Sequence, residues 1–452
     1  MKKREFLAMG GALPLMLAGC GSGSGSAPMR LVNASVGYPL LGFMDQSTPA
    51  TTADVAYGAT SPYINVEAGA VGLTLTVGGA SATAAQIRTV SKDSRYSLVA
   101  FGFANLLKSV LITESTVVPD TGQANVNVLN TSVDIGPVDV YLSTTQDLSV
   151  STLIASGISG VSQSAFAGIL AGSYYVTVVG ANSIAQGVND QRFQTPTPIV
   201  LTALQVLTII LTPGASGVLA NAIMLTQGTT GTAVSYLNTT ARLRAVSAVG
   251  GKTVAVSENV LPSNTASQYG DYVVVTTGAP PVVTVNGATV PTTMTTTTTT
   301  GTGTTAVTTS TVGPAVLVAG GDYTLMVYLD GNGNPVSSMI TDDNTAPVTA
   351  SGVKFRLINL VSNNQGLSLS MSVNSVGVAS LVTYGNASKY KELTTPQTTN
   401  STATVYNGTD ALLSHIQVMT LPNIFTEIVV GVDTTTNPIT VKDFFRSATV
   451  SS

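Results

Sequence analysis

Short stretches in which apolar and polar side chains alternate recur along most of the chain. Alternation with a period of two predicts a β-strand with one buried face. Four of these stretches share one opening pattern: Arg30-Leu31-Val32-Asn33, Asn127-Val128-Leu129-Asn130, Arg244-Ala245-Val246-Ser247 and Arg356-Leu357-Ile358-Asn359. Their similar spacing along the chain predicts four copies of one unit.

A second repeated pattern lies in the middle of the unit. Residues 55–63 and 382–390 agree at Val, Tyr, Gly, Ser and Tyr in one register. Late apolar stretches follow at 96–102, 206–211, 323–328 and 425–431. About seven short strands in roughly 100 residues, separated by Gly, Asn and Pro, predict an immunoglobulin-like β-sandwich. The fold class is therefore all-β, with about four tandem sandwiches.

The tyrosines of this middle pattern are candidate ligand contacts: Tyr57, Tyr63, Tyr384 and Tyr390. A tyrosine at such a position most simply packs its ring on the core, with the hydroxyl at the rim. Contact with a ligand is the alternative interpretation.

The amino-acid composition excludes several classes of protein function. Only 9% of the residues are charged, against the ~25% usual in soluble domains. The chain has 18 basic and 22 acidic residues. It therefore lacks the excess of basic residues that nucleic-acid binding requires, and we do not expect it to bind nucleic acid. One His, one Cys and no Trp remove most catalytic and metal chemistry. We therefore expect a protein that is not an enzyme and needs no cofactor.

The N-terminus has the features of an export signal. A basic start at Lys2, Lys3 and Arg4 precedes an apolar stretch that is too short to span a bilayer. Leu17-Ala18-Gly19-Cys20 resembles the lipobox of bacterial lipoproteins. The resemblance implies cleavage between Gly19 and Cys20 and acylation of Cys20, which would hold the protein on a membrane.

Two further features concern the destination. Gly21 follows the acylated position, where Asp would resemble an inner-membrane retention signal, so the outer membrane of a Gram-negative host is favoured. Lys3-Arg4-Glu5-Phe6-Leu7 resembles a twin-arginine export motif with Lys in place of the first Arg. Ordinary secretory export remains the alternative route.

The repeats also resemble a known family. The opening at 30–35, the strand at 138–141, the Tyr-Gly-x-x-Ser-x-Tyr pattern at 57–63 and 384–390, and the late strands at 96–98 and 323–325 carry the resemblance. They are similar to the bacterial immunoglobulin-like domain-of-unknown-function family numbered four-three-nine-seven, which occurs in tandem in envelope lipoproteins. The resemblance implies the sandwich fold and implies no catalytic residue.

These observations divide the chain into an export segment and four units. The expected parts are a signal peptide at 1–19, the lipidated Cys20 with a flexible tether at 20–28, and units at 29–120, 121–231, 232–347 and 348–452. The third unit contains a threonine-rich insertion from Thr292 to Val312. We expect an exposed loop or long hairpin there, because Thr favours extended backbone but buries little apolar surface. Its role is padding, an O-glycosylated stretch or a partner-binding strand.

Three polar features of the sequence are candidate chemical sites. Asp330, Asn332 and Asn334 present oxygen ligands at alternate positions, like the start of a calcium loop. The same residues suffice as a hairpin turn, which we favour. His415 lies in a strand pattern beside the polar residues Ser414 and Gln417, so we expect it at the surface. Asn33 and Asn130 begin glycosylation sequons but are better interpreted as strand-end side chains that bond the backbone.

The sequence favours one function and leaves a second open. The first is a lipid-anchored envelope scaffold, adhesin or binding module, attached to the membrane through acyl chains on Cys20 and contacting an unidentified protein or glycan. The second is an accessory lipoprotein that binds envelope glycans or solutes. The absence of Trp, the residue that sugar-binding platforms favour, weighs against it. Neither interpretation includes nucleic acid.

Overall fold

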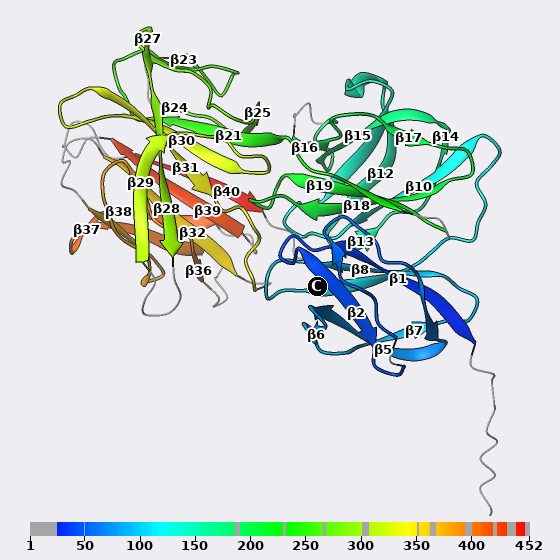
Figure 1. Ribbon diagram of the computed structural model, residues 1–452. Coiled ribbons are helices and arrows are strands. Elements are labelled where there is room, and N and C mark those ends of the chain that lie inside the picture. The colour runs from blue at the N-terminus through cyan, green and yellow to red at the C-terminus, as the bar shows by residue number, and fades with distance from the viewer. Residues whose placement is uncertain are drawn as a thin grey trace, which may run out of the picture.

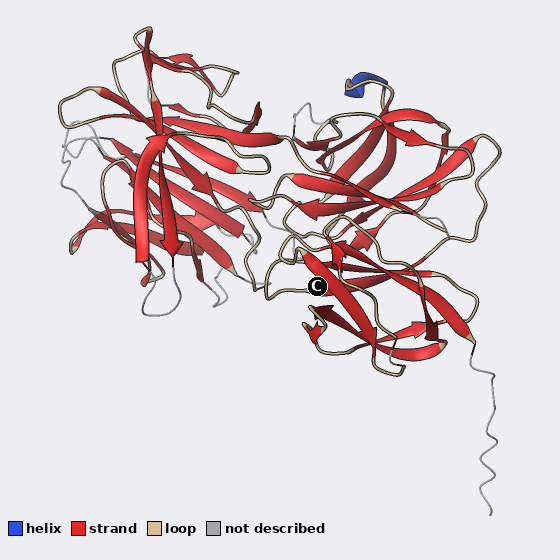
Figure 2. Ribbon diagram, viewed as in Figure 1, coloured by secondary structure: helices blue, strands red, loops and turns tan. Residues whose placement is uncertain are grey.

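The computed structural model describes residues 25–447, except 49, 186–189, 229–231, 265–267, 301–306, 350–351, 362–367, 394–399, 419–422 and 432–439. Regular structure in this part is β-strand apart from one 3-10 turn at Leu148–Val150 (Figure 2). The described residues form no helix that is long and apolar enough to cross a membrane. The strands form separate sheets that stack in pairs, so the prediction of tandem all-β sandwiches is confirmed.

The first unit shows the plan that the others repeat. One sheet contains the opening strand and has the order β4-β1-β8-β9; we call such a sheet the pairing sheet. Its strands are β4 (Ile64–Glu67), β1 (Ser26–Ala34), β8 (Tyr96–Phe101) and β9 (Lys108–Thr113). The other sheet contains β3 (Val55–Ala56), β2 (Leu40–Asp45), β5 (Gly69–Val77), β6 (Ala80–Ser81) and β7 (Gln86–Val90). The core between them includes Met29, Phe43 and Leu98.

The second unit has the same plan with an added edge strand. Its pairing sheet contains β13 (Ser162–Gln163), β14 (Ala167–Leu170), β10 (Gln123–Asn130), β18 (Val206–Pro213), β19 (Ala220–Thr226) and β20 (Ala233–Tyr236). Its other sheet contains β12 (Thr152–Ile158), β11 (Val138–Ser143), β15 (Gly172–Gly180), β16 (Gln191–Gln194) and β17 (Ile199–Leu201). Because β20 pairs with β19, this unit extends beyond the expected boundary at residue 231.

The third unit carries the threonine-rich insertion as a regular hairpin. Its pairing sheet contains β24 (Gln268–Tyr269), β25 (Val273–Thr276), β21 (Thr240–Ser247), β30 (Asp322–Leu329), β31 (Pro335–Asp342), β28 (Thr292–Thr300) and β29 (Val307–Pro314). Its other sheet contains β23 (Leu261–Asn264), β22 (Val254–Val256), β26 (Val283–Val285) and β27 (Ala288–Val290). Of the two expected forms of the insertion, an exposed loop or a long hairpin, the structure shows the hairpin, in which β28 and β29 pair antiparallel.

The fourth unit returns to the simple plan. Its pairing sheet contains β35 (Asn386–Ala387), β36 (Lys391–Leu393), β32 (Val353–Val361), β39 (Asn423–Gly431) and β40 (Thr440–Ser447). Its other sheet contains β34 (Val376–Val382), β33 (Leu369–Val373), β37 (Asn400–Asn407) and β38 (Asp410–Val418).

Each opening strand lies inside its sheet and runs parallel to the late strand of the same unit. Thus β1 pairs with β8, β10 with β18, β21 with β30 and β32 with β39 in parallel, while the remaining neighbours in these sheets, except β28 beside β31, are antiparallel. A parallel pair needs a long crossover, which the second sheet of each unit supplies. The first strand also starts at Ser26 rather than Met29, because Ser26–Met29 pairs with β4.

The units pack in two pairs through their pairing sheets, as Figure 1 shows. Between units one and two, Val32 and Phe101 pack against Leu129 and Ile210. Between units three and four, Met326 packs against Ile358 in the same way. The expectation that an opening strand buries only one face is therefore wrong, because its second face is buried against the partner unit.

Asparagines fix the end of the opening strand. The Asn33 side chain donates to the carbonyls of Tyr38 and Val55 and accepts from the backbone of Ser35. Asn130 makes the corresponding bonds to Gly136, Ile158 and Ser132. The interpretation of both asparagines as strand-end side chains is confirmed.

Substitution of Ile210 tests the packing between the first two units. Ile210 is fully buried between the pairing sheets, so Ile210→Ala should destabilise them by about 2–5 kcal/mol. Hydrogen–deuterium exchange of peptides covering β1 and β18 measures this loss. Ile87→Ala, at a side chain that is 69% exposed, serves as the control and should change exchange little. Equal protection of wild type and Ile210→Ala would contradict the pairing.

Candidate functional site

Three of the four opening strands carry an arginine at the same position. Arg30, Arg244 and Arg356 are each at most 3% exposed. They lie on the face of β1, β21 and β32 that points away from the core of their own unit. A guanidinium group retains its charge when buried, so each needs a carboxylate and hydrogen-bond acceptors within reach.

Asp342 supplies the carboxylate between units three and four. It ends β31 and is fully enclosed, and both arginines reach it. The Arg244 Nη2 atom lies 3.6 Å from Asp342 Oδ2, and Arg356 Nη2 forms an ion pair with Asp342 Oδ1. Because Arg356 belongs to the fourth unit, this ion pair joins two sandwiches.

Hydroxyl groups complete the hydrogen bonding of this carboxylate. Thr324 Oγ1 donates to Asp342 Oδ2 at 2.7 Å and accepts from Arg244 Nε at 2.8 Å. The Tyr272 hydroxyl also donates to Asp342 Oδ2. The charge on Asp342 is thus held by donors from β30, β32 and the loop before β25. We call Arg244, Asp342, Arg356, Thr324 and Tyr272 the double-arginine cluster.

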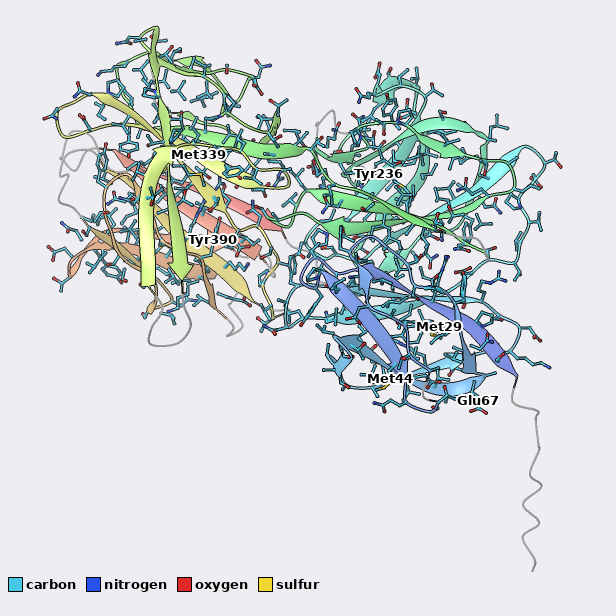
Figure 3. The ribbon with its side chains drawn as sticks, viewed as in Figure 1. Met29, Met44, Glu67, Tyr236, Met339 and Tyr390 are labelled. Atoms are coloured by element: carbon cyan, nitrogen blue, oxygen red, sulfur yellow. The ribbon has the colours of Figure 1, made fainter. Side chains whose placement is uncertain are left out.

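Aromatic rings cover the guanidinium groups. The Arg244 and Arg242 guanidinium carbons lie 4.7 and 4.6 Å from the centroid of the Tyr272 ring. Arg356 stands 4.6 Å from the Tyr390 ring, whose position Figure 3 labels. Cation–π contacts of this kind favour the charged form of an arginine that has lost its water.

The pKa values of this cluster follow from burial and charge together. Burial alone raises the pKa of Asp342, but the Arg356 and Arg244 guanidinium groups and two hydroxyl donors outweigh it, so the pKa lies below its ordinary value of 3.8. Burial raises the pKa of Tyr272 and of Tyr390. Their hydroxyl groups therefore stay protonated, and that of Tyr272 donates to Asp342.

A simpler version of the cluster joins units one and two. Arg30 Nη2 lies 2.9 Å from Glu114 Oε1, which also accepts from the Tyr63 hydroxyl at 2.6 Å. Arg30 reaches the second unit through the carbonyl of Thr226 at 2.9 Å. Gly228 of the second unit in turn donates its N–H to Glu114 Oε2 at 2.9 Å.

The second unit has an asparagine where the others have arginine. Asn127 is 1% exposed, and its side-chain amide has no hydrogen-bond partner among the described residues. Among the residues that the structure describes, Arg30 is the one arginine paired with Glu114, so one cation balances one anion in this cluster. Sequence reasoning missed both clusters, although the arginines recur in the opening pattern and the acids stand at or directly after the end of a final strand.

The predicted tyrosines occupy two kinds of position. Tyr63 and Tyr390 lie over the buried arginines of their own units. Tyr57 and Tyr384 reach across to the partner unit: the Tyr57 hydroxyl is 2.7 Å from Thr212 Oγ1, and Tyr384 donates to the carbonyl of Leu329 at 2.8 Å. Burial raises the pKa of Tyr384 to about 12. All four hydroxyls are engaged within the protein.

The remaining candidate residues lie apart from these clusters. Asp330 and Asn334 form the turn between β30 and β31, where Asp330 Oδ1 accepts from the backbone of Asn332 and Asn334 at 2.9 and 2.8 Å. The hairpin-turn interpretation is confirmed. The backbone of His415 lies in β38 opposite Ala403. Gly19 and Cys20 lie outside the described residues, so both remain predictions.

The described residues contain no group of three or more His, Cys, Asp or Glu side chains that would hold a metal ion. A surface pocket of about 460 Å³ lies where the first three units meet. It is bordered by Val36, Phe103, Ala215, Leu237 and Gly320 and is mainly apolar. The pocket therefore offers few polar groups to a ligand, and the buried charges of Arg30, Arg244 and Arg356 lie in the two clusters between the units.

Removing the shared carboxylate should destabilise the second pair. Asp342→Asn leaves two buried guanidinium groups without their anion, which costs about 3–5 kcal/mol. Asp343→Asn is the matched control: its side chain is 52% exposed and pairs with Lys354, so about 1 kcal/mol or less is expected. Hydrogen–deuterium exchange of β31 and β32 measures both. Equal exchange in the two variants would contradict the assigned role of Asp342.

The same carboxylate predicts acid sensitivity. Because the pKa of Asp342 is lower in the folded protein than its ordinary value of 3.8, the stabilisation is complete above pH 3.8. It is lost as the pH falls from 3.8 towards the folded pKa. The stability difference between wild type and Asp342→Asn should therefore shrink below pH 3.8, as measured by urea unfolding at successive pH values. A difference independent of pH would contradict an ionised Asp342.

Comparison with known proteins identifies one segment. Residues 27–141 match the family described as Domain of unknown function (DUF4397). This match covers the first unit and continues through β10 to β11 of the second. No curated protein matches the chain. Residues 27–141, which include the Arg30–Glu114 cluster, thus belong to the domain-of-unknown-function family DUF4397.

Proposed function

We propose that this protein is a lipid-anchored cell-envelope protein whose paired sandwiches act as a non-catalytic scaffold or binding module. The supporting observation is the order of features at the N-terminus. Leu17-Ala18-Gly19-Cys20 has the lipobox pattern, a Gly/Ser segment follows, and β1 begins at Ser26. Acylation of Cys20 would attach the first sandwich to a membrane.

The short segment between Cys20 and β1 keeps the body near the membrane. A flexible chain of the length of Gly21–Gly25 reaches on the order of 12 Å. The first unit then lies close to the lipid headgroups, and the other units extend from it. Gly21 in place of Asp favours the outer membrane.

The scaffold role is supported by how the units are joined. Apolar contacts and the hydrogen bonds that Arg30 and Glu114 make to the second unit hold units one and two together. Apolar contacts and the Arg356–Asp342 ion pair hold units three and four together. Unit two also contacts unit three, because the backbone N–H of Asp322 donates to Ser216 Oγ at 2.9 Å. Such a body presents its loops and exposed strands in a constant arrangement, which suits contact with envelope proteins or glycans.

Replacing the acylated cysteine tests the anchor. Cys20→Ser removes the thiol that would carry the lipid, so the full chain should move from the membrane fraction to the soluble fraction. Immunoblotting of fractionated cells of a Gram-negative host measures the partition. Mass spectrometry of the N-terminal peptide should show a lipidated Cys20 in the wild-type protein.

Ser22→Ala provides the control, because it alters the tether without touching the thiol. This variant should remain in the membrane fraction. Membrane association of Cys20→Ser equal to that of the wild type, or an unmodified Cys20 in the mature protein, would refute the anchor.

A further inference from the structure

One end of the first unit lies directly beside the proposed anchor. Gly25 is the first described residue, and β1 begins after it with Ser26, which pairs with Glu67 (labelled in Figure 3). The segment Gly21–Gly25 joins this end to Cys20 and reaches on the order of 12 Å. Acyl chains on Cys20 would therefore bring this end of the unit to the lipid surface.

The loop after β9 leaves the first unit at the same end. β1 and β8 run parallel, with Met29 beside Tyr96, and β9 runs antiparallel to β8, with Thr113 beside Tyr96. β9 is thus two strands from β1, a separation of about 10 Å. The loop of residues 114–122 therefore starts close to the point where the chain enters β1.

The second unit presents a turn at this end too. The backbone N–H of Ser115, two residues after β9, donates at 2.7 Å to Oε1 of Gln227, directly after β19. Gln205 Nε2 donates to Thr226 Oγ1 at 3.0 Å, which ties the turn at 202–205 to the same end of β19. Ser115 and this turn border one surface depression of about 360 Å³. The loop after β9 and the turn are therefore neighbours.

Large apolar side chains are exposed on these segments. Val117 and Val118 are 68% and 72% exposed, and Leu204 in the turn is 55% exposed. Leu170, which is 67% exposed, pairs with Gln123 at the start of β10, and the carbonyl of Gln123 accepts from the backbone of Leu204. Exposed apolar side chains gathered in one place mark contact surfaces for proteins or membranes. We call Val117, Val118, Leu170 and Leu204 the apolar tip.

The charges around the apolar tip do not favour an anionic partner. In the loops at this end, Lys92 and Arg95 are matched by Asp93 and Asp120, and Glu67 adds a further acid. This end thus has no excess of cations to attract anionic lipids. A contact with lipid must instead come from burying the apolar side chains at the boundary between headgroups and acyl chains.

We propose that the apolar tip inserts into the lipid surface to which Cys20 is anchored, so that the first two units stand on the membrane at this end. The inference rests on the proposed lipid anchor. Because the anchor keeps the tip beside the bilayer, insertion is in effect an intramolecular step, and individually weak apolar contacts suffice. The second point of attachment fixes the orientation of the body, which a flexible tether alone would leave free.

A fluorophore on the apolar tip tests the insertion in the full chain. Cys20 is the only cysteine of the sequence, and in the lipidated protein its sulfur is blocked, so Val118→Cys supplies the one free thiol. The variant is labelled with a polarity-sensitive fluorophore and reconstituted in vesicles of phosphatidylethanolamine and phosphatidylglycerol. Phospholipids with a nitroxide on the acyl chain should quench it strongly, because the label lies among the acyl chains.

Leu40→Cys is the matched control. Leu40 is 51% exposed at the start of β2, beyond the far end of β1, whose nine residues span roughly 25 Å. Its label should be quenched severalfold less than that of Val118→Cys. Equal quenching in the two singly labelled variants would overturn the inference and leave the anchor standing. A second fluorophore attached at Cys20 would show an unmodified thiol, which overturns the anchor and the inference with it.

Vesicle composition separates apolar insertion from attraction by charge. The contrast between Val118→Cys and Leu40→Cys should be the same in phosphatidylcholine vesicles, which carry no net charge, because the charges around the tip balance. A contrast confined to vesicles with anionic lipid would contradict insertion through apolar side chains.

Removing the valines distinguishes insertion from simple proximity to the membrane. With the fluorophore on Leu204→Cys, the additional change Val117→Ser/Val118→Ser should reduce quenching severalfold, because two inserted side chains are lost. Leu40→Ser in the same labelled background should leave quenching unchanged. Circular dichroism verifies that the variants are folded. Quenching that is unaffected by the loss of both valines would mean that the tether alone holds this end near the lipid, and the inserted tip would be wrong.

Discussion

A buried guanidinium group must find a carboxylate, and this constraint places an acidic side chain at each surface where two sandwiches meet. Arg30, Arg244 and Arg356 project from the opening strands on the face opposite to their own core. An isolated sandwich would expose that face to water. In the protein it is covered by the pairing sheet of the next unit, and the acids Glu114 and Asp342 lie where they meet the arginines. Charge neutralisation and apolar packing therefore act at the same surface.

The two pairs satisfy the constraint with different numbers of charges. Between units three and four, Asp342 pairs with two arginines. Tyrosine rings contact the guanidinium groups, and hydroxyl groups donate to the carboxylate. Between units one and two, a single arginine meets Glu114, and Asn127 takes the place of the second. Each cluster therefore contains one carboxylate, paired with one arginine in the first pair and with two in the second. The same architecture thus tolerates a change in the number of buried cations.

Pairing alters how a tandem array of sandwiches is understood. Units that touched only end to end would form a chain of separate bodies, whereas these bury one sheet of every unit. The tyrosines that sequence reasoning offered as ligand contacts take part in this arrangement, with Tyr57 and Tyr384 bridging the units. The hydroxyl groups of all four tyrosines are therefore engaged in contacts within the protein.

The sequence by itself determined the class of fold, the repeated unit and the turn at Asp330, because period-two alternation and turn residues act locally. It also indicated the strand-end roles of Asn33 and Asn130. It did not determine that β1 runs parallel to β8, nor that the second face of each opening strand is buried. These features depend on contacts such as Arg356 with Asp342, which join different units. Only the tertiary structure decided them, because an alternating strand has the same pattern whether its polar face meets water or a partner's carboxylate.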